Sequence, residues 1–276
     1  MDIFYSLSLW QLTIIVLGIA LLLGLGFSVG IRKILRLNPT AQQADLAIDL
    51  MQVTSTYIGI LLAFAGVLAW QSYEDAATAV ESEAGVASLV YRDLTAYGTE
   101  MDPARHSLRS YVNSVLADEW PLLREGKRSN RTEERLSTLF ANIAAVTPTN
   151  EREAAIYRES LMQLNEMVAL RRARMAASRA QLPPVLWIVA LVGSVLTIAY
   201  ASAFVSSRYA LLMISGTSLT IGLLFLFLLS VDQPFRHRGG VSNAPLIELA
   251  WVFDRVDRVH EEVARTRRAR ESPPPR

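Results

Sequence analysis

Cysteine is absent from the 276-residue sequence, and histidine occurs only three times. Without cysteine the chain has no disulfide, no thiol nucleophile and no thiolate ligand for a metal. The absence does not indicate whether the protein lies in an oxidising or a reducing compartment. His106, His237 and His260 form no HxxxH or HExxH pair, the spacing that places two imidazoles on one helix face. We therefore predict that the chain holds no metal and no cofactor.

Catalytic signatures are missing as well. The sequence contains no Walker loop, no G-x-S-x-G elbow and no EF-hand calcium loop. The acidic pairs Asp118-Glu119 and Glu133-Glu134 are interpreted as solvated or packing charges rather than as acid–base pairs. We predict no catalytic residue, so the chain is not expected to be an enzyme. A net charge of +1 gives no reason to expect a nucleic-acid partner.

Charge is absent from four long stretches, which are residues 3–31, 50–73, 180–207 and 209–231. About 20 helical residues cross the ~30 Å hydrocarbon core of a bilayer, so each stretch is long enough to span it. The first stretch lacks a basic leader and a small-residue cleavage pattern, so it is interpreted as a retained anchor. The sequence therefore predicts an integral membrane protein with four spans and the lipid bilayer as its surroundings.

Basic residues predict the orientation of the spans. Segments 74–179 and 232–276, which four spans place on one side, hold 23 of the 27 lysines and arginines. The short loop 32–49 alone favours the opposite orientation. We expect the two larger segments and both termini to lie in the cytoplasm, and the membrane to be a bacterial inner (plasma) membrane.

The predicted fold class is all-α, with four transmembrane spans and a cytoplasmic helical domain built from long extensions of spans two and three. The predicted division comprises transmembrane helices 1 and 2 (1–70), the cytoplasmic helical domain (71–182), transmembrane helices 3 and 4 (183–231), and an amphipathic helix with a disordered tail (232–276).

Span two is predicted to continue as a helix beyond the membrane. Over residues 73–94, apolar and small side chains recur with spacings of four and three, which is typical of the buried seam of a packed helix. The acidic residues of this stretch, Glu83 among them, fall on the opposite positions and are expected to face water. Tyr97-Gly98 provides a glycine signal for the helix end.

Further helices are expected in the helical domain and in the tail. They cover about residues 102–123, 132–146, 150–181 and 245–268. Asp102 is the predicted N-cap of the first. The end of the third is basic, with Arg171, Arg172, Arg174 and Arg179, and cations suit a helix C-terminus and lipid phosphates. Pro183-Pro184 then breaks or bends the chain. The tail helix is amphipathic and is expected to lie on the bilayer or on a neighbouring subunit.

Three smaller features of the spans have structural interpretations. Gly26 and Gly30 form a GxxxG pair, which either marks a close helix contact or is a common feature of apolar runs. The hydroxyls between Ser215 and Thr220 either line a wet path or bond the backbone carbonyl one turn back. Asp232 stands at a helix end that disfavours an acid, so it is expected to have a specific partner.

A set of short motifs occurs in a fixed order along the chain. They are Leu61-Leu62-Ala63-Phe64, Ala69-Trp70, Tyr73-Glu74, Glu83-Ala84, Glu119-Trp120-Pro121, Leu182-Pro183-Pro184 and Asp232-Gln233-Pro234-Phe235. With the order of elements, they resemble the bestrophin-like family of bacterial and plant membrane proteins over nearly the whole chain. More distantly, span two resembles the second helix of bestrophins, which are pentameric anion channels whose second helices surround a narrow apolar neck.

The resemblance implies that span two lines a pore. The candidate pore-lining residues are Thr56, near the outer end, and Ile60, Ala63, Phe64 and Val67 in the neck. An apolar neck gates by dewetting and needs no charge. The sequence departs from bestrophins because no arginine follows Phe64 and the acidic calcium clasp has no clear counterpart. Calcium gating is therefore not expected, and ion selectivity stays open.

The function implied is a homo-oligomeric, pentameric passive channel for ions such as chloride. All four predicted spans lack acidic and basic side chains, which argues against ion-coupled transport. The alternative is a non-conducting membrane scaffold or signalling subunit that binds a protein partner through its cytoplasmic helices. On that alternative, Ile60 and Phe64 are ordinary helix-packing residues.

Overall fold

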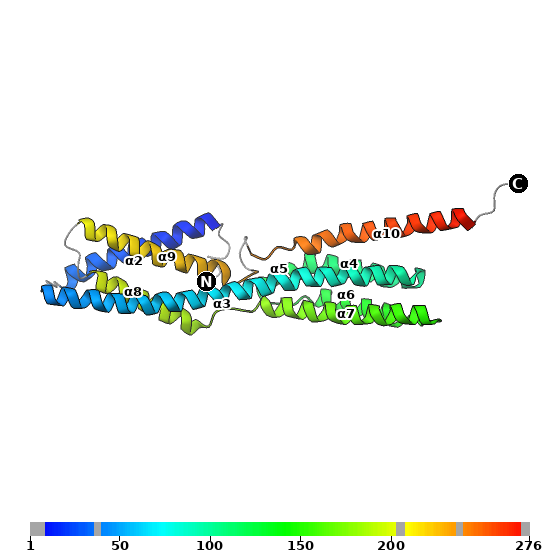
Figure 1. Cartoon of the computed structure of the whole chain (residues 1–276), viewed down its shortest axis with the longest axis horizontal. Coiled ribbons are helices and arrows are strands. Elements are labelled where there is room, and N and C mark those ends of the chain that lie inside the picture. Colours follow the sequence, from blue (N-terminus) through cyan, green and yellow to red (C-terminus); the bar gives the residue numbers. More distant parts are fainter. Residues whose placement is uncertain (1–8, 36–39, 203–207, 236–239, 272–276) are drawn as a thin grey trace. The chain divides into compact units, whose positions relative to one another are not determined.

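The computed structural model describes residues 9–35, 40–202, 208–235 and 240–271 (Figure 1). Helix makes up 88% of the structure, and the described residues contain no strand, so the all-α prediction is confirmed. The chain divides into a membrane unit, residues 1–74 and 180–240, and a polar unit, residues 75–179 and 241–276. The four-part division stays a prediction, and the predicted disordered end, 272–276, lies outside the described residues.

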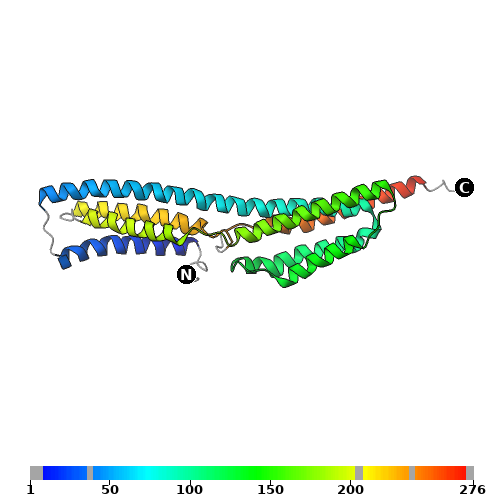
Figure 2. The ribbon, with the colours of Figure 1, turned by 90° about the horizontal axis from the view of Figure 1, so that it is seen from below.

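The membrane unit contains four long apolar helices. They are α2 (Leu9–Leu35), the first part of α3 (Ala41–Tyr97), α8 (Pro184–Ser202) and α9 (Arg208–Val231). Each contains a stretch long and apolar enough to cross a bilayer, so the chain is an integral membrane protein. Within this unit α8 and α9 lie between α2 and α3 (Figure 2).

Close packing of α2 on α9 occurs at glycines, although not at the GxxxG pair. A Cβ atom added to Gly24 would lie 1.9 Å from Ser218 Oγ, and one added to Gly222 would lie 2.8 Å from Ala20 Cβ. Added to Gly26 or Gly30 it would meet no described atom within 4 Å. The contact therefore depends on which glycine the partner helix faces, which the spacing of the motif does not specify.

The hydroxyls of α9 mostly bond within their own helix. Of the four between Ser215 and Thr220, three bond the carbonyl four residues back, as Ser215 to Leu211, Thr217 to Met213 and Thr220 to Gly216. This confirms the backbone interpretation for these three. Ser218 differs, because its hydroxyl is buried against Gly24 without a hydrogen-bond partner among the described residues.

Asp232 has the specific partner that its position predicted. The backbone N–H of Leu182 donates to Asp232 Oδ1 at 2.6 Å. Leu182 lies just before the N-terminus of α8, so the carboxylate at the end of α9 meets the positive end of a second helix dipole. The preceding helix, α7 (Glu151–Ala177), ends before this turn. The predicted extension of span three is therefore a separate helix, because the two prolines interrupt the backbone ladder.

The polar unit contains the second part of α3, a 3₁₀ turn and several further helices. They are η1 (Thr99–Met101), α4 (Asp102–Ser114), the π-helical η2 (Val115–Glu119), α5 (Trp120–Leu123), α6 (Asn130–Ala144), α7 and α10 (Ala244–Glu271). The seam predicted for α3 is buried from Val80 to Leu94, and α3 ends at Tyr97 before Gly98, whose φ is 127°. Asp102 is the first residue of α4 rather than its N-cap, because η1 precedes it.

Four ionisable side chains are buried together inside the polar unit. Arg174 donates from Nε to Glu83 Oε2 at 2.6 Å and from Nη2 to Glu119 Oε1 at 2.9 Å. Arg171 donates from Nη2 to Glu119 Oε2 at 2.6 Å. All four side chains are buried. The predictions that Glu83 faces water and that Arg171 and Arg174 face lipid phosphates are therefore wrong, because each charge has an opposite charge within the protein.

Tyr111 extends this buried charge cluster. Its hydroxyl donates to Glu83 Oε1 at 2.8 Å. Burial raises the pKa of Tyr111 well above its ordinary value, and the charge of Glu83 adds to the rise. Burial also acts to raise the pKa of Glu119, but the hydrogen bond from Arg171 and the charge of Arg174 outweigh it and hold that pKa below its ordinary value.

The first half of α10 packs on its own chain. Phe253 stacks on Tyr91 with ring centroids 4.1 Å apart. Asp257 accepts from Tyr91 Oη at 2.7 Å and from Arg109 Nη2 at 2.8 Å. The prediction that this helix lies on the bilayer or on a neighbouring subunit is therefore wrong for its first half, whereas Val263 further along is exposed.

Candidate pore-lining face

In the membrane unit, one face of α3 is buried against α8 and α9. Small and branched residues of α3 contact the start and middle of α8 and the end of α9. The cluster comprises Leu62, Ala65, Ala69, Leu182, Ala190, Leu228 and Val231. Apolar burial of this kind holds α3 in one rotation about its axis, because turning the helix would expose these side chains and bury bulkier ones.

Close contacts at two glycines further restrict the rotation of α3 about its axis. A Cβ at Gly193 of α8 would lie 1.9 Å from Ile58 Cδ1, so Ile58 occupies the space above the glycine. A Cβ at Gly66 of α3 would lie 3.1 Å from Phe227 Cε1 of α9. Because both contacts depend on a missing side chain, α3 is fixed with Ile58 and Gly66 turned toward its neighbours.

The five predicted pore-lining residues all lie on the uncovered side of α3. Ile60 is 51% exposed, Phe64 67% and Val67 55%, and Thr56 and Ala63 are exposed as well. At about 100° per residue, the five side chains fall within roughly 100° of the helix circumference, nearly opposite the buried face. We call this set the α3 stripe. Its side chains do not pack inside the single chain. The role of the stripe in a pore stays a prediction.

Polar atoms are rare along the α3 stripe. The hydroxyl of Thr56 donates to the carbonyl of Gln52 at 2.8 Å, so it bonds within its own helix. The other four members are apolar. A surface of this kind offers an ion no ligand, and a narrow passage lined by it would conduct only when wetted.

Acidic residues lie at both ends of the α3 stripe. Asp45 and Asp49 precede it and Glu74 follows it, and helical rotation places all three in the same sector. All three side chains are exposed. No lysine, arginine or histidine occurs between residues 41 and 91. Sequence reasoning missed this arrangement, although continuing the same helical period from the neck residues would have found it.

The arrangement offers little to a metal or a catalytic reaction. Within the ranges that the structure describes, no three acidic or histidine side chains gather closely enough to hold a metal ion. Asp232 accepts a hydrogen bond from the backbone N–H of Leu182. The α3 stripe itself is an apolar surface with exposed acidic residues at both ends.

A comparison with protein families assigns the chain to one of them. A family model described as the bestrophin-like domain matches residues 18–246, from within α2 to the first turn of α10. The chain belongs to the bestrophin-like family. A comparison with curated proteins gave no significant match.

The bestrophin-like assignment confirms the resemblance predicted from the motifs. The matched region contains α3 with its stripe, the buried charge cluster, and the hairpin of α8 and α9. Bestrophin-like proteins are generally of channel type rather than enzymatic, which favours a channel-like protein here. Ion selectivity and subunit number do not follow from the match.

Proposed function

We propose that this bestrophin-like protein is the subunit of a homo-oligomeric passive ion channel, in which the α3 stripes of several subunits surround the pore. The observation that carries the proposal is the exposure of Ile60, Phe64 and Val67 along one line of a membrane helix whose opposite face is buried. One subunit cannot enclose a passage with an outward face. Several copies around an axis can, and the resemblance to bestrophins implies five.

The proposal extends to mechanism and orientation. The apolar segment of α3 lacks ionisable side chains between Leu50 and Tyr73, which supports passive movement over coupled transport. The apolar neck gates by wetting and drying. The polar unit and both termini lie on the cytoplasmic side, because they carry most of the basic residues.

The sign of the ion is the point at which resemblance and charge disagree. Bestrophins conduct anions, so the resemblance implies chloride. In a ring of subunits, however, Asp45, Asp49 and Glu74 would form carboxylate rings at the two ends of the pore. Such rings attract cations and repel anions, and α3 offers no basic side chain before Arg92 to offset them. We follow the charges and propose a preference for cations.

The first experiment is the mass of the purified complex, corrected for bound detergent. Five subunits support the proposed assembly, whereas a monomer or dimer cannot surround a pore with α3 and would overturn it.

The complex is then reconstituted in planar bilayers. Phe64→Ala should raise the conductance, because it removes the bulkiest side chain of the α3 stripe.

A matched control separates a pore residue from a lipid-facing one. Leu223 of α9 is 53% exposed, close to the value for Ile60, yet it is not on the α3 stripe. Ile60→Ala should change the current, and Leu223→Ala should leave it unchanged. Equal currents in the wild type, Phe64→Ala and Ile60→Ala channels would contradict the neck assignment.

The reversal potential across a KCl gradient tests the ion sign. We expect a reversal potential close to the equilibrium potential of potassium. Combining Asp49→Asn with Glu74→Gln should shift it toward the equilibrium potential of chloride. The control combines Glu134→Gln with Glu166→Gln, which removes the same charge from exposed positions of α6 and α7. A chloride preference in the wild type would reject the cation proposal while leaving the channel intact.

The scaffold function is the second candidate. It is favoured by exposed charged residues on α3 within the polar unit, Glu81 and Arg92, and by exposed Trp251 and Val263 on α10. It predicts a stable partner in pull-down that is lost on Glu81→Lys or Arg92→Glu and retained on Phe64→Ala. The channel proposal predicts instead that Phe64→Ala changes the recorded current and that Glu81→Lys and Arg92→Glu do not.

A further inference from the structure

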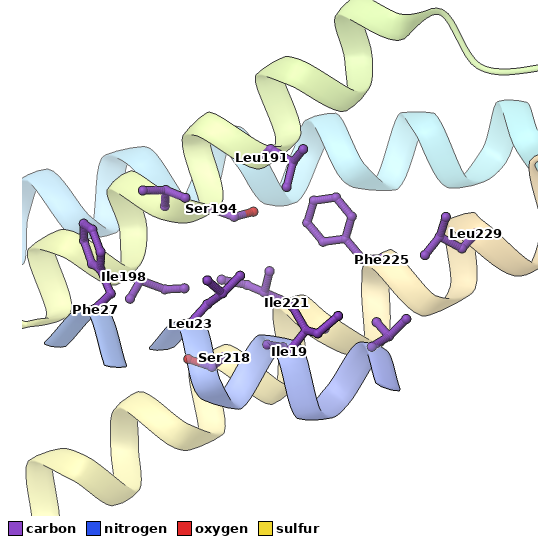
Figure 3. A pocket seen from close by; sticks show the side chains of 14 residues that line it. Ile19, Leu23, Phe27, Leu191, Ser194, Ile198, Ser218, Ile221, Phe225 and Leu229 are labelled. Carbon is purple, nitrogen blue, oxygen red and sulfur yellow. The ribbon is translucent and has the colours of Figure 1, made fainter. Parts of the chain in front are cut away.

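A groove of about 250 Å³ lies among α2, α8 and α9 in the membrane unit. Figure 3 shows side chains of all three helices around it, with Leu23 and Phe27 from α2, Leu191 and Ile198 from α8, and Phe225 from α9. No residue of α3 contributes to the lining. The groove is therefore distinct from the α3 stripe.

The packing of glycines explains why the groove exists. Gly24 and Gly222 let α2 and α9 approach closely, as the position of Ser218 against Gly24 shows. The branched and aromatic side chains further along these helices prevent α8 from closing as tightly. A space too large for the surrounding side chains to fill remains between α2 and α8, with α9 as its floor.

The wall of the groove presents almost no polar atom to an occupant. Ser194 donates its hydroxyl to the carbonyl of Ala190 at 2.7 Å. The hydroxyl of Ser218 is fully buried against Gly24 and does not reach the groove surface. The remaining lining residues are apolar or glycine. Water gains no hydrogen bonds in such a space, whereas an engineered apolar cavity of about 150 Å³ in another protein stays dry and holds benzene.

The surroundings of the groove indicate its occupant. The residues at its mouth, Ile19 and Leu23 on α2 and Leu191 on α8, are exposed and belong to apolar stretches long enough to span a bilayer. The medium at the mouth is therefore lipid hydrocarbon. From Ile19 to Phe27 the mouth extends roughly 12 Å at 1.5 Å per residue. That length is close to half of the ~30 Å hydrocarbon core, which is the depth of one leaflet.

We propose that the groove binds one acyl chain of a membrane phospholipid. The chain lies between α2 and α8, and its terminal part contacts Ile198 on the α8 side of the groove. Burial of its methylene groups against Leu23, Leu191 and Phe225 replaces an empty space with dispersion contacts. A bound chain thereby supports the packing of α8 on α2, which the protein's own side chains leave incomplete.

Photolabelling with a lipid tests this proposal. The full chain is reconstituted in vesicles of phosphatidylcholine and phosphatidylglycerol that contain a trace of phosphatidylcholine with a diazirine on its acyl chain. After illumination, mass spectrometry locates the labelled residues. We expect label on Ile198, which is only 7% exposed in the folded chain, in addition to label on the lipid-facing Leu223.

Two variants of matched chemistry complete the test. Val195→Trp places a bulky side chain at the mouth and should reduce the labelling of Ile198 to background, with Leu223 still labelled. Leu223→Trp adds the same side chain outside the groove and should leave Ile198 labelled. Label on Leu223 without label on Ile198 in the wild type would overturn the proposal. Labelling of Ile198 that persists in Val195→Trp would also overturn it, because the lipid would then reach Ile198 by a route other than the mouth of the groove.

Discussion

In the membrane unit, Thr217 bonds a carbonyl four residues back in its own helix, whereas in the polar unit Glu83 bonds Arg174 across 91 residues of chain. The first kind of contact forms as soon as the helix forms and does not specify how the helix packs against its neighbours. The second forms only when α3 and α7 are correctly placed. The two units therefore differ in what specifies their packing, which is apolar surface and glycine in one and paired charge in the other.

The same contrast extends to exposed surface. The membrane unit leaves large apolar side chains such as Phe64 and Leu223 uncovered, whereas the polar unit buries two arginines, Arg171 and Arg174. Uncovered apolar surface is stable in lipid and available to other subunits. The proposed pore at the α3 stripe and the proposed lipid site in the groove both belong to this unit, whose internal packing is the less specific.

Removing one member of the buried charge cluster gives the largest expected effect. Arg174→Ala leaves Glu83 and Glu119 buried with fewer cationic partners, and breaking a buried pair in this way costs about 3–5 kcal/mol. We expect a markedly lower melting temperature, measured by circular dichroism in detergent. Arg172→Ala, an exposed arginine on the same helix, is the control and should melt close to the wild type. Equal melting of both variants would contradict the contrast between the units.

Loosening α10 should give an intermediate effect. Asp257→Asn weakens the bonds from Tyr91 and Arg109, and because the Asp257 side chain is 33% exposed we expect less than the roughly 1.5–3 kcal/mol of a buried charged hydrogen bond. Hydrogen exchange of α10 should accelerate while that of α7 stays unchanged. Glu261→Gln, an exposed change on α10 away from these contacts, is the control, and an equal acceleration in that variant would reject the proposed role of Asp257.

Acid should destabilise the polar unit through Glu119. The pKa of this carboxyl is lowered in the folded state from an unfolded value of 4.5, so the folded state binds its proton less readily than the unfolded state. Its contribution to stability is present above the unfolded pKa and is lost as the pH falls through the folded one. Melting temperatures measured from neutral to acidic pH should fall in this window, and Glu119→Gln should flatten that fall. An unchanged pH profile in the variant would exclude Glu119 as its source.

Sequence periodicity predicted the helices far better than it predicted the charge cluster. The seam of α3 and its end at Tyr97 follow from spacings of three and four and from Gly98, which are local properties. Glu83 lies beside that seam, one residue before Ala84, and only a partner 91 residues away decides that it is buried. The spacing of Arg171 and Arg174 on one helix face was the available signal, but it is equally typical of an exposed basic surface.

The membrane unit shows the same limit for helix contacts. The four apolar stretches are evident from the absence of charge, and their exposed and buried faces are not, since every face is apolar. Gly24 rather than Gly26 makes the close contact because α9 happens to face that side of α2. The stripe residues Ile60 and Phe64 were selected by resemblance, and the same helical period, continued in both directions, would have added Asp49 and Glu74.

Hydroxyl removal in α9 should give the smallest effect. Thr217→Val and Ser215→Ala each delete a hydrogen bond from a side chain of α9 to a carbonyl of the same helix. Because those carbonyls keep their backbone hydrogen bonds, we expect the free energy of unfolding to change by less than about 0.5 kcal/mol, as for surface substitutions. Melting in detergent and channel currents should both match the wild type. A large loss of current with unchanged melting would mean that these hydroxyls line a wet path after all. A large loss of stability would instead show that the membrane unit, like the polar unit, depends on specific polar contacts.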